Sequence, residues 1–490
     1  MRLKAFSIFT VLFFLFIGTG MGQIDTTWTK IYGGDRDDKA YDIISTADSG
    51  YLVIGSTSSF GFDNSQMYFL KLDSTGAIMW SKSHGGSNQE AGHAVIQTQD
   101  GGYLGVGYTN SWGSGGFDLL MVKLDANGNT IFEKYFGGTD WDFAWDVLET
   151  QPNVFVMAGE TQSFGSGGKD AWIVRYDASN DIFDWNKTIG GSDIDDYKAI
   201  TPNPTGGFYA AGRGVQTGHP DEDVMVTRFD ANGDTIWNRY YGDTLQDYAN
   251  DIEHLNNSKV AITGTTFFSS DTTQTLVLSI DSVGQKAFLD FWGLGFSKFE
   301  GQKVIEMDSN RIGISSTFDA FPGNTDMHFG YTYPSTGFYE KGSTYGLLDN
   351  ESNSGLIYLN ETGFIISGSS LSYGSNFSKI VTYLTDNRGQ VITPNIFETI
   401  HDTLNIVSVT ATEFERTLGI AKNKITNNSM IYNYDVRIFD TSGRVVLLNT
   451  LFPQQELDLN LQRQLNGIYI IQYINTSFPN DSGFIKFSLF

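Results

Sequence analysis

The feature that most constrains this chain is a sequence unit of roughly 52 residues that recurs along residues 23–394. Its landmarks are a glycine doublet, an Asp-containing turn and a mid-strand glycine. The glycine series runs Gly33, Gly85, Gly137, Gly190, Gly242, Gly293 and Gly346, and the last three members are single glycines. Self-similarity at a period near 50 residues is typical of propellers, solenoids and repeat arrays.

Each unit contains four strand-like runs and no helical pattern. In the second unit the runs are HAVIQTQ, GYLGVGYT, FDLLMVKLD and NTIFEKYF, all short and rich in β-branched and aromatic residues. Turns of Gly, Asp, Asn and Ser separate them, and these residues supply positive φ or bond their own backbone. Seven such units predict an all-β fold, a seven-bladed β-propeller with four-stranded blades.

The ends of the array predict how the ring closes. An aromatic residue stands five positions before most glycine landmarks, on the expected fourth strand: Trp28, Trp80, Phe132, Trp185, Trp237 and Phe288. Trp28 precedes the first unit and has no blade of its own, whereas the seventh unit has only Thr393 at this place. We therefore expect residues 27–32 to pair beside the third strand of the seventh unit, near Lys379 to Leu384, and so to remove an open sheet edge.

Charge and cysteine content exclude several functional classes. Lys+Arg total 31 against 56 for Asp+Glu, and the resulting net charge of −25 argues against nucleic acid and anionic membrane surfaces as partners. The chain has no cysteine, so disulfides, thiol catalysis and thiolate metal sites are excluded. The 55 glycines and 14% aromatic residues suit a large, turn-dense β core.

The N-terminal residues predict export. Residues 1–22 combine Arg2 and Lys4 with an apolar run and a small-residue tail, the pattern of a secretory signal peptide. The alternative is a membrane anchor, but the apolar run is short for a span. Residues 23–394 then form the propeller and residues 395–410 a polar linker, and we expect no transmembrane segment in the mature chain.

Residues 411–490 lose the repeat and predict a second, small all-β domain. It contains a hairpin turn at Thr441–Gly443, the run Leu457–Leu461, an Asn466–Tyr469 block and a final strand with Lys486. These features resemble the type A C-terminal sorting domain of the type IX secretion system of Bacteroidetes. The repeat likewise resembles the glycine-rich arrays of secreted proteins of that phylum, which imply no assigned activity.

The resemblance implies a β-sandwich-like fold and a route of export. The type IX machinery would be a partner, and the protein would pass through the periplasm to be secreted or held at the outer-membrane surface. The residues that would carry the sorting signal are Gly443, Arg444, Gly467, Ile468, Tyr469 and Lys486.

A column of carboxylates follows the glycine landmark at a fixed distance. Its members are Asp38, Glu90, Asp142, Asp195 and Asp247, with Glu300 (two places late) and Glu351 in the weaker units. The first strand of a blade lines the axis, so we expect these residues at one mouth of the channel. There a ring of carboxylates would attract a cation, for which calcium is the candidate, or a basic ligand. The alternative, which we favour, is that each carboxylate caps N–H groups of its own turn. Small residues two places on, such as Ala40 and Gly92, would suit a crowded axis.

Two further motifs have structural interpretations. Asp125–Thr130 resembles the start of a calcium loop, but the distal Glu is absent and a hairpin turn is favoured. The Asp73–Trp80 pattern resembles the Asp-box of sialidases and the tryptophan-docking motif of quinoprotein propellers, with different spacing. Blade-to-blade packing is the favoured role of the tryptophan.

No residue is singled out as catalytic. The carboxylates offer no distinguished pair, the histidines show no metal-binding spacing, and GxSxG and P-loop motifs are absent from the sequence. Aromatic residues near loops would either stack on sugar rings or wedge blades together: Trp112, Trp141, Trp145 and Phe164. The regular units favour a secreted or cell-surface, non-catalytic binding or adhesion propeller for a glycan or a protein. The alternative is an extracellular polysaccharide hydrolase or lyase acting at the channel mouth.

Overall fold

The computed structural model describes most of residues 28–385 and seven strands between residues 418 and 489. Within the first range the residues not described are 63, 217, 220, 244, 270–271, 294–297, 309–310, 322–323, 334–338, 346–349 and 372–376. The predicted signal peptide and linker lie outside the described residues. In the part of the chain that is described, no helix combines the length and apolar character needed to cross a membrane.

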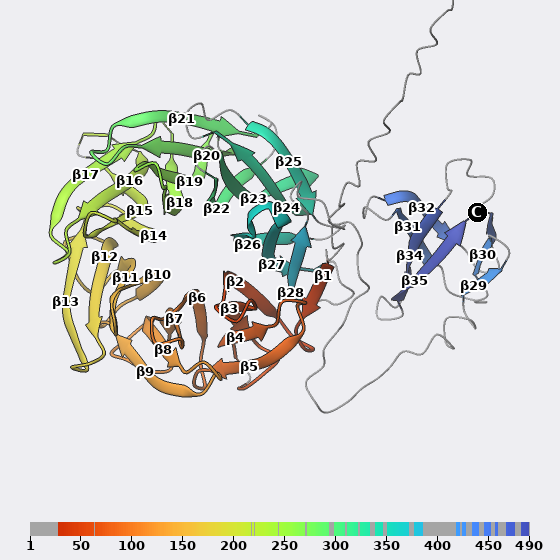
Figure 1. Cartoon of the computed structure of the whole chain (residues 1–490), viewed down its shortest axis with the longest axis horizontal. Coiled ribbons are helices and arrows are strands. Elements are labelled where there is room, and N and C mark those ends of the chain that lie inside the picture. The colour runs from red at the N-terminus through yellow and green to blue at the C-terminus, as the bar shows by residue number, and fades with distance from the viewer. Residues whose placement is uncertain are drawn as a thin grey trace, which may run out of the picture.

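Residues 28–385 form seven four-stranded antiparallel sheets arranged as blades around a central axis (Figure 1). This confirms the predicted seven-bladed β-propeller. The strands of the first four blades are β2 (Asp38–Ser45), β3 (Tyr51–Thr57), β4 (Gln66–Leu72), β5 (Ile78–His84); β6 (Glu90–Gln97), β7 (Tyr103–Thr109), β8 (Asp118–Leu124), β9 (Thr130–Phe136); β10 (Asp142–Gln151), β11 (Val154–Thr161), β12 (Asp170–Asp177), β13 (Ile182–Ile189); and β14 (Asp196–Pro202), β15 (Phe208–Val215), β16 (Glu222–Phe229), β17 (Thr235–Tyr241).

The last three blades follow the same plan in spite of their weaker repeat. Their strands are β18 (Asp247–His254), β19 (Val260–Phe267), β20 (Thr273–Ile280), β21 (Lys286–Trp292); β22 (Phe299–Asp308), β23 (Arg311–Phe321), β24 (Asn324–Thr332), β25 (Tyr339–Tyr345); and β26 (Glu351–Tyr358), β27 (Phe364–Ser370), β28 (Lys379–Thr385) with β1 (Trp28–Tyr32). The core lies between neighbouring blades, where the second and third strands are buried almost throughout.

The ring closes through β1, which is the outer strand of blade seven. It pairs antiparallel with β28, so that Trp28 lies opposite Leu384 and Tyr32 opposite Ile380. Trp28 and Tyr32 are only 4% and 1% exposed. The predicted closure is therefore confirmed, because the first strand of the chain completes the blade that its last propeller strands begin.

The recurring tryptophans pack between blades, against a hairpin glycine of the following blade. A Cβ atom added at Gly128 would lie 2.9 Å from the ring of Trp80, and one added at Gly233 would lie 2.5 Å from the ring of Trp185. Both glycines also have positive φ, +79° and +75°. Glycine is therefore required at this turn for its backbone conformation and for the close approach of the tryptophan, and the predicted packing role is confirmed.

The turn at Asp125 is a hairpin turn, as favoured from the sequence. Asp125 Oδ1 accepts hydrogen bonds of 2.8 Å from the backbone N–H groups of both Asn127 and Asn129. The turn joins β8 to β9, which pair along their whole length. The carboxylate thus satisfies the turn that it belongs to.

The described strands of the C-terminal region form two antiparallel sheets. One contains β29 (Leu418–Ala421), β30 (Lys424–Asn427) and β33 (Glu456–Asp458). The other has the order β32 (Val445–Leu451), β31 (Tyr434–Asp440), β34 (Gly467–Asn475), β35 (Ser482–Leu489). Gly467, Ile468 and Tyr469 begin β34 and Lys486 lies in β35, whereas Gly443 and Arg444 are outside the described residues. The β-sandwich-like arrangement and the sorting role stay predictions.

Candidate functional site

Every inner strand of the propeller carries a β-bulge at the same position. At this position the pairing of each first and second strand skips one residue, and a bulge of this kind places one additional residue on the inner strand and re-aims its side chain. The seven skipped residues, which we call the bulge ring, are Tyr41, His93, Trp145, Lys198, Asn250, Gln302 and Ser354.

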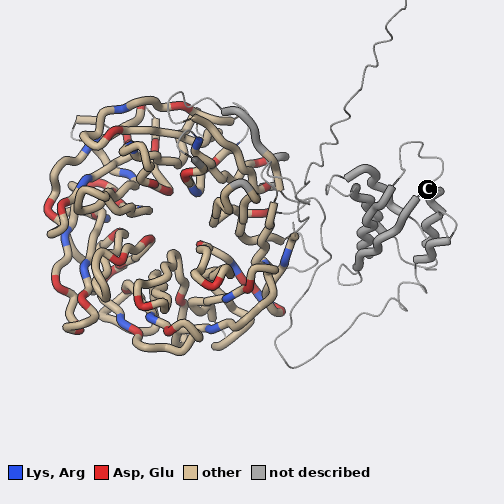
Figure 2. The backbone as a smooth tube through the Cα atoms, viewed as in Figure 1, with Lys and Arg blue, Asp and Glu red and all other residues tan. Residues whose placement is uncertain are grey.

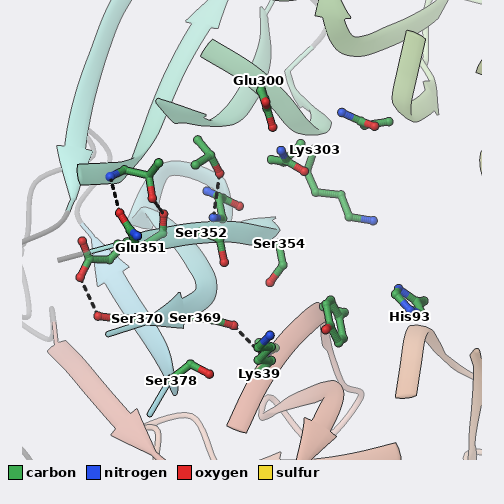
Figure 3. A pocket seen from close by; sticks show the side chains of 18 of the residues that line it. Lys39, His93, Glu300, Lys303, Glu351, Ser352, Ser354, Ser369, Ser370 and Ser378 are labelled. Atoms are coloured by element: carbon green, nitrogen blue, oxygen red, sulfur yellow. Dashed lines mark hydrogen bonds between the residues drawn. The ribbon is translucent and has the colours of Figure 1, made fainter. Parts of the chain in front are cut away.

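All seven members of the bulge ring line one cavity of about 640 Å³. Figure 3 shows side chains from different blades, among them His93, Lys303 and Ser354, arranged around this common space. Each member of the ring is partly buried. The cavity therefore has one recognition position per blade, and its size falls in the range of small-molecule sites, roughly 300–1,000 Å³.

One arc of the bulge ring is aromatic. The rings of Tyr41 and His93 lie 4.6 Å apart, and His93 meets Trp145 edge-on at 4.3 Å. Burial, reinforced by the nearby charge of Lys198, lowers the pKa of His93 to about 3, so its imidazole is neutral at physiological pH. The opposite arc consists of the neutral polar residues Asn250, Gln302 and Ser354.

Lys198 joins the two arcs and is already paired within the protein. Its ammonium nitrogen lies 3.8 Å from the centroid of the Trp145 ring and 3.3 Å from Glu160 Oε2. Burial would raise the pKa of Glu160, but the charges of Lys198 and Lys169 outweigh it and lower that pKa. Lys198 is thus held against the aromatic arc by a carboxylate and a π face together.

A layer of charged residues lies next to the bulge ring along the inner strands. Asp42, Asp146 and Asp251 directly follow bulge residues of blades one, three and five, and each accepts a backbone N–H bond from the following blade at 3.2, 2.9 and 2.8 Å. Lys303 Nζ lies 3.6 Å from Asp42 and 3.7 Å from Asp251. Burial raises the pKa of Asp146 to about 7 despite the nearby lysine. These aspartates fasten neighbouring blades together, and Lys303 offsets part of their charge.

The carboxylate column predicted from the sequence is buried, and each member bonds to its own blade. Asp38 Oδ2 accepts the N–H of Gly34 at 2.8 Å, Glu90 Oε2 that of Gly86 at 3.0 Å, and Asp142 Oδ2 that of Gly138 at 2.7 Å. The same turn contact recurs at Asp195 with Gly191 and at Asp247 with Asp243. Asp38, Glu90, Asp142, Asp195, Asp247 and Glu351 are all at most 1% exposed.

In several blades a hydroxyl group of the second strand also donates a hydrogen bond to the carboxylate. Thr109 donates to Glu90 at 2.9 Å, and Ser370 donates to Glu351 at 2.6 Å. The geometry is that of turn capping, the alternative favoured from the sequence. No cluster of three metal-ligating side chains occurs among the residues that the structure describes. Calcium binding stays a prediction, which a fall in melting temperature on chelation would support.

The sixth blade departs from the column, and the assignment of Glu300 to it was wrong. By strand register Phe299 occupies the carboxylate position, opposite Phe318, and the two rings stack 4.8 Å apart. One residue more separates Gly293 from the bulge in this blade than in the others. Glu300 therefore lies on the opposite face of β22 from Phe299, and its side chain lines the central cavity.

Of the small residues expected at the axis, Ala40 lines the central cavity, whereas Gly92 lies against the neighbouring blade. A Cβ atom added at Gly92 would lie 2.4 Å from Ile54 Cδ1 of blade one. Ala40, Ala144 and Ala249 at the same position are buried.

Sequence reasoning offered only Trp145 of the bulge ring as a candidate ligand contact. It placed Trp145 with the loop aromatics, but the structure places it on β10 in the channel, while Trp112 and Trp141 are exposed and Phe164 packs in the core. The sequence holds one signal for these positions, since the column three residues after the buried carboxylate varies from Tyr to His, Trp, Lys, Asn and Ser while the carboxylate itself recurs.

No protein-family model and no curated protein sequence matches this chain. Many solved structures match it. Sqt1 of Chaetomium thermophilum, bound to the N-terminus of ribosomal protein L10, aligns at 10% identity and a TM-score of 0.42, over 72% of this chain and 98% of that one. YCF48 bound to D1 peptide aligns at 9% identity and 0.44, over 74% and 96%. A puromycin hydrolase aligns at 13% identity and 0.45, over 69% of this chain and 51% of that one. At these values the similarities carry no argument about function.

Proposed function

We propose that this chain is an exported, non-catalytic binding or adhesion propeller whose ligand, a glycan or a protein, enters its central channel. The bulge ring is the observation that supports this proposal. Positions that serve packing repeat the same chemistry from blade to blade, as the buried carboxylates do. The bulge ring presents a different side chain in every blade, as recognition of an asymmetric ligand requires.

The proposal is tested by binding and degradation assays run side by side on the full chain. A glycan array and a panel of soluble proteins report binding, and release of reducing ends from the same polysaccharides reports catalysis. We expect binding that is lost in an Asn250→Ala/Gln302→Ala double variant, without degradation. Degradation that the same substitutions abolish would instead favour the hydrolase or lyase alternative. The low pKa of His93 makes it a weak general base near neutral pH, which argues against that alternative at this residue.

We further propose that the protein reaches the cell surface or medium through type IX secretion. The support is the sequence resemblance of residues 411–490 to type A sorting domains. Deleting residues 405–490 should leave a folded propeller in the periplasm, and replacing Gly467, Ile468 and Tyr469 by alanine should weaken export without loss of folding. Normal surface delivery of the truncated chain would refute this route.

A further inference from the structure

A continuous line of aromatic rings runs from the exposed residue that precedes β10 into the channel. Trp141 stands directly before β10, and Phe143 and Trp145 alternate at its start, with ring centroids 6.2 Å apart for the first pair and 5.5 Å for the second. The line continues from Trp145 to His93 and from His93 to Tyr41. We call these five residues the aromatic track. It connects an exposed tryptophan, Trp141 at 49% exposure, with the bulge ring.

The track occurs on one side of the channel only. The residues equivalent to Phe143 in the other blades are Lys39, Ala91, Asp196, Tyr248, Glu300 and Ser352. Those equivalent to Trp141 are Asp37, Gln89, Ile194, Gln246, Lys298 and Asn350. Blade three alone carries an aromatic residue at all three levels, so blade packing does not require the track.

Neighbouring side chains hold the track in place. Tyr108 and Phe117 of blade two contact the ring of Phe143 at 5.2 and 5.5 Å, and Phe117 also meets Trp141 edge-on at 5.6 Å. Rings fixed in this way present a surface whose binding costs little conformational entropy. Phe143 stacks on Phe117 and on Trp145, so the preformed and exposed stacking face of the track is that of Trp141.

Three cations near the track are paired within the protein, whereas Lys39, on the same inner strand as Tyr41, is exposed and lines the cavity. Lys198 contacts Glu160, Lys303 lies between Asp42 and Asp251, and Arg213 donates to Asp196 at 2.8 Å. A ligand that approaches here meets few free cations, and the net charge of −25 repels anionic polymers. Figure 2 shows basic positions interspersed with acidic ones around the ring rather than gathered on one side. The surroundings thus favour a neutral ligand.

The polar groups that remain in the cavity suit hydroxyl groups. Asn250, Gln302 and Ser354 each offer donors and acceptors, as a sugar hydroxyl does. Within the described part of the chain, the buried Nε1 of Trp145 and Nε2 of His93 have no hydrogen-bond partner. Both lie on residues that line the cavity.

We propose that the aromatic track binds a neutral polysaccharide, whose sugar rings stack on Trp141 and its neighbours while the chain end reaches the bulge ring. A sugar ring has an apolar C–H face for the track and hydroxyls for Asn250, Gln302 and Ser354. This inference rests on the proposed function that the ligand enters the channel. It adds the ligand class and the path by which the ligand enters.

The test is affinity electrophoresis of the full chain in gels that contain laminarin, hydroxyethyl cellulose, xylan or mannan, with alginate and polygalacturonate as anionic polymers. We expect retardation by at least one neutral polymer and by neither anionic one. Trp141→Ala should weaken that retardation about tenfold, because a stacked ring face is lost. Phe268→Ala is the matched control, since Phe268 is an exposed aromatic residue of blade five at 61% exposure. It should bind as the parent does, and both variants should keep the parent melting temperature.

Three results would overturn the inference and separate it from the proposed function. Equal binding by the Trp141→Ala and Phe268→Ala variants refutes the track, and stronger retardation by alginate or polygalacturonate refutes the neutral ligand class. If no neutral polymer retards the protein and channel-binding peptides are instead selected from a displayed library, the ligand is a peptide rather than a glycan. The proposed binding function then stands. If neither polymer nor peptide binding changes in Asn250→Ala/Gln302→Ala, the proposed function fails as well.

Discussion

A disulfide introduced across the closure of the ring tests the role of the N-terminal strand directly. Lys30 lies opposite Thr382 in the β1–β28 pairing, and residues directly opposite in an antiparallel pair have Cα atoms roughly 4.5–5.5 Å apart, within disulfide range. The chain has no cysteine, so Lys30→Cys/Thr382→Cys permits a single intramolecular bond. That bond would link the first strand of the propeller to its last.

The expected gain in stability follows from the length of chain enclosed. The new loop spans about 350 residues, for which the chain-entropy expression gives on the order of 6 kcal/mol at 25 °C. Strain in the native state reduces such gains, and about 2–4 kcal/mol is the typical outcome. We therefore expect the oxidised variant to unfold at a clearly higher urea concentration than the same variant under reducing conditions.

The register provides the matched control. Leu384 pairs with Trp28, two positions from Thr382, so Lys30→Cys/Leu384→Cys sets the two cysteines on a diagonal of roughly 7–8 Å. Thiol titration and the mobility of the oxidised chain in a denaturing gel report bond formation. Oxidation of the diagonal pair alone would show the register to be wrong. Free thiols in both variants would refute β1 as the closing strand.

Three further changes test the packing and the charges. Gly128→Ala should destabilise the propeller by about 2–4 kcal/mol, since a Cβ meets Trp80 at positive φ, whereas Gly101→Ala, at φ +83° with nothing within 4 Å, should cost only about 1–2 kcal/mol in urea unfolding. Lys303→Met should lower the free energy of unfolding by about 1–3 kcal/mol at pH 7, because Asp42 and Asp251 lose their counter-charge. The difference in urea midpoint between variant and parent should shrink at acid pH, where the two aspartates become protonated. The pKa of Asp146 is raised to about 7 in the folded state, above its value in the unfolded chain. Its contribution to the free energy of unfolding should therefore decline from pH 4 to pH 7 in the parent, and this decline should be absent in Asp146→Asn.

The repeat and the closure were predictable from sequence because both depend on residues at a constant period. A tryptophan such as Trp80 recurs because its ring packs against a hairpin glycine such as Gly128 of the following blade. Trp28 packs in the same way although it precedes the first sequence unit. Such positions have one structural solution that is used many times. Counting alone therefore located the partner of β1 to within a residue at either end.

The channel was not predictable in the same way because a bulge breaks the alternation of strand faces. Up to Ala40 the inner strand alternates regularly, but the additional residue Tyr41 brings two successive side chains toward the channel. Counting from a distant landmark fails for the same reason in blade six, where one more residue separates Gly293 from Phe299. Local register, which the sequence does not specify, decides which residues a ligand would meet.

The pairing of β1 with β28 also has a consequence for how the propeller folds. Strands within a blade are neighbours in sequence and form through short turns, but the last blade needs two segments about 350 residues apart. Contacts at such separation form late and slowly. The docking of β1 is thus the expected rate-limiting event, and until it happens β28 exposes a full strand edge to other chains. A nascent molecule is therefore most prone to aggregate in the interval after six blades have formed and before the seventh is complete.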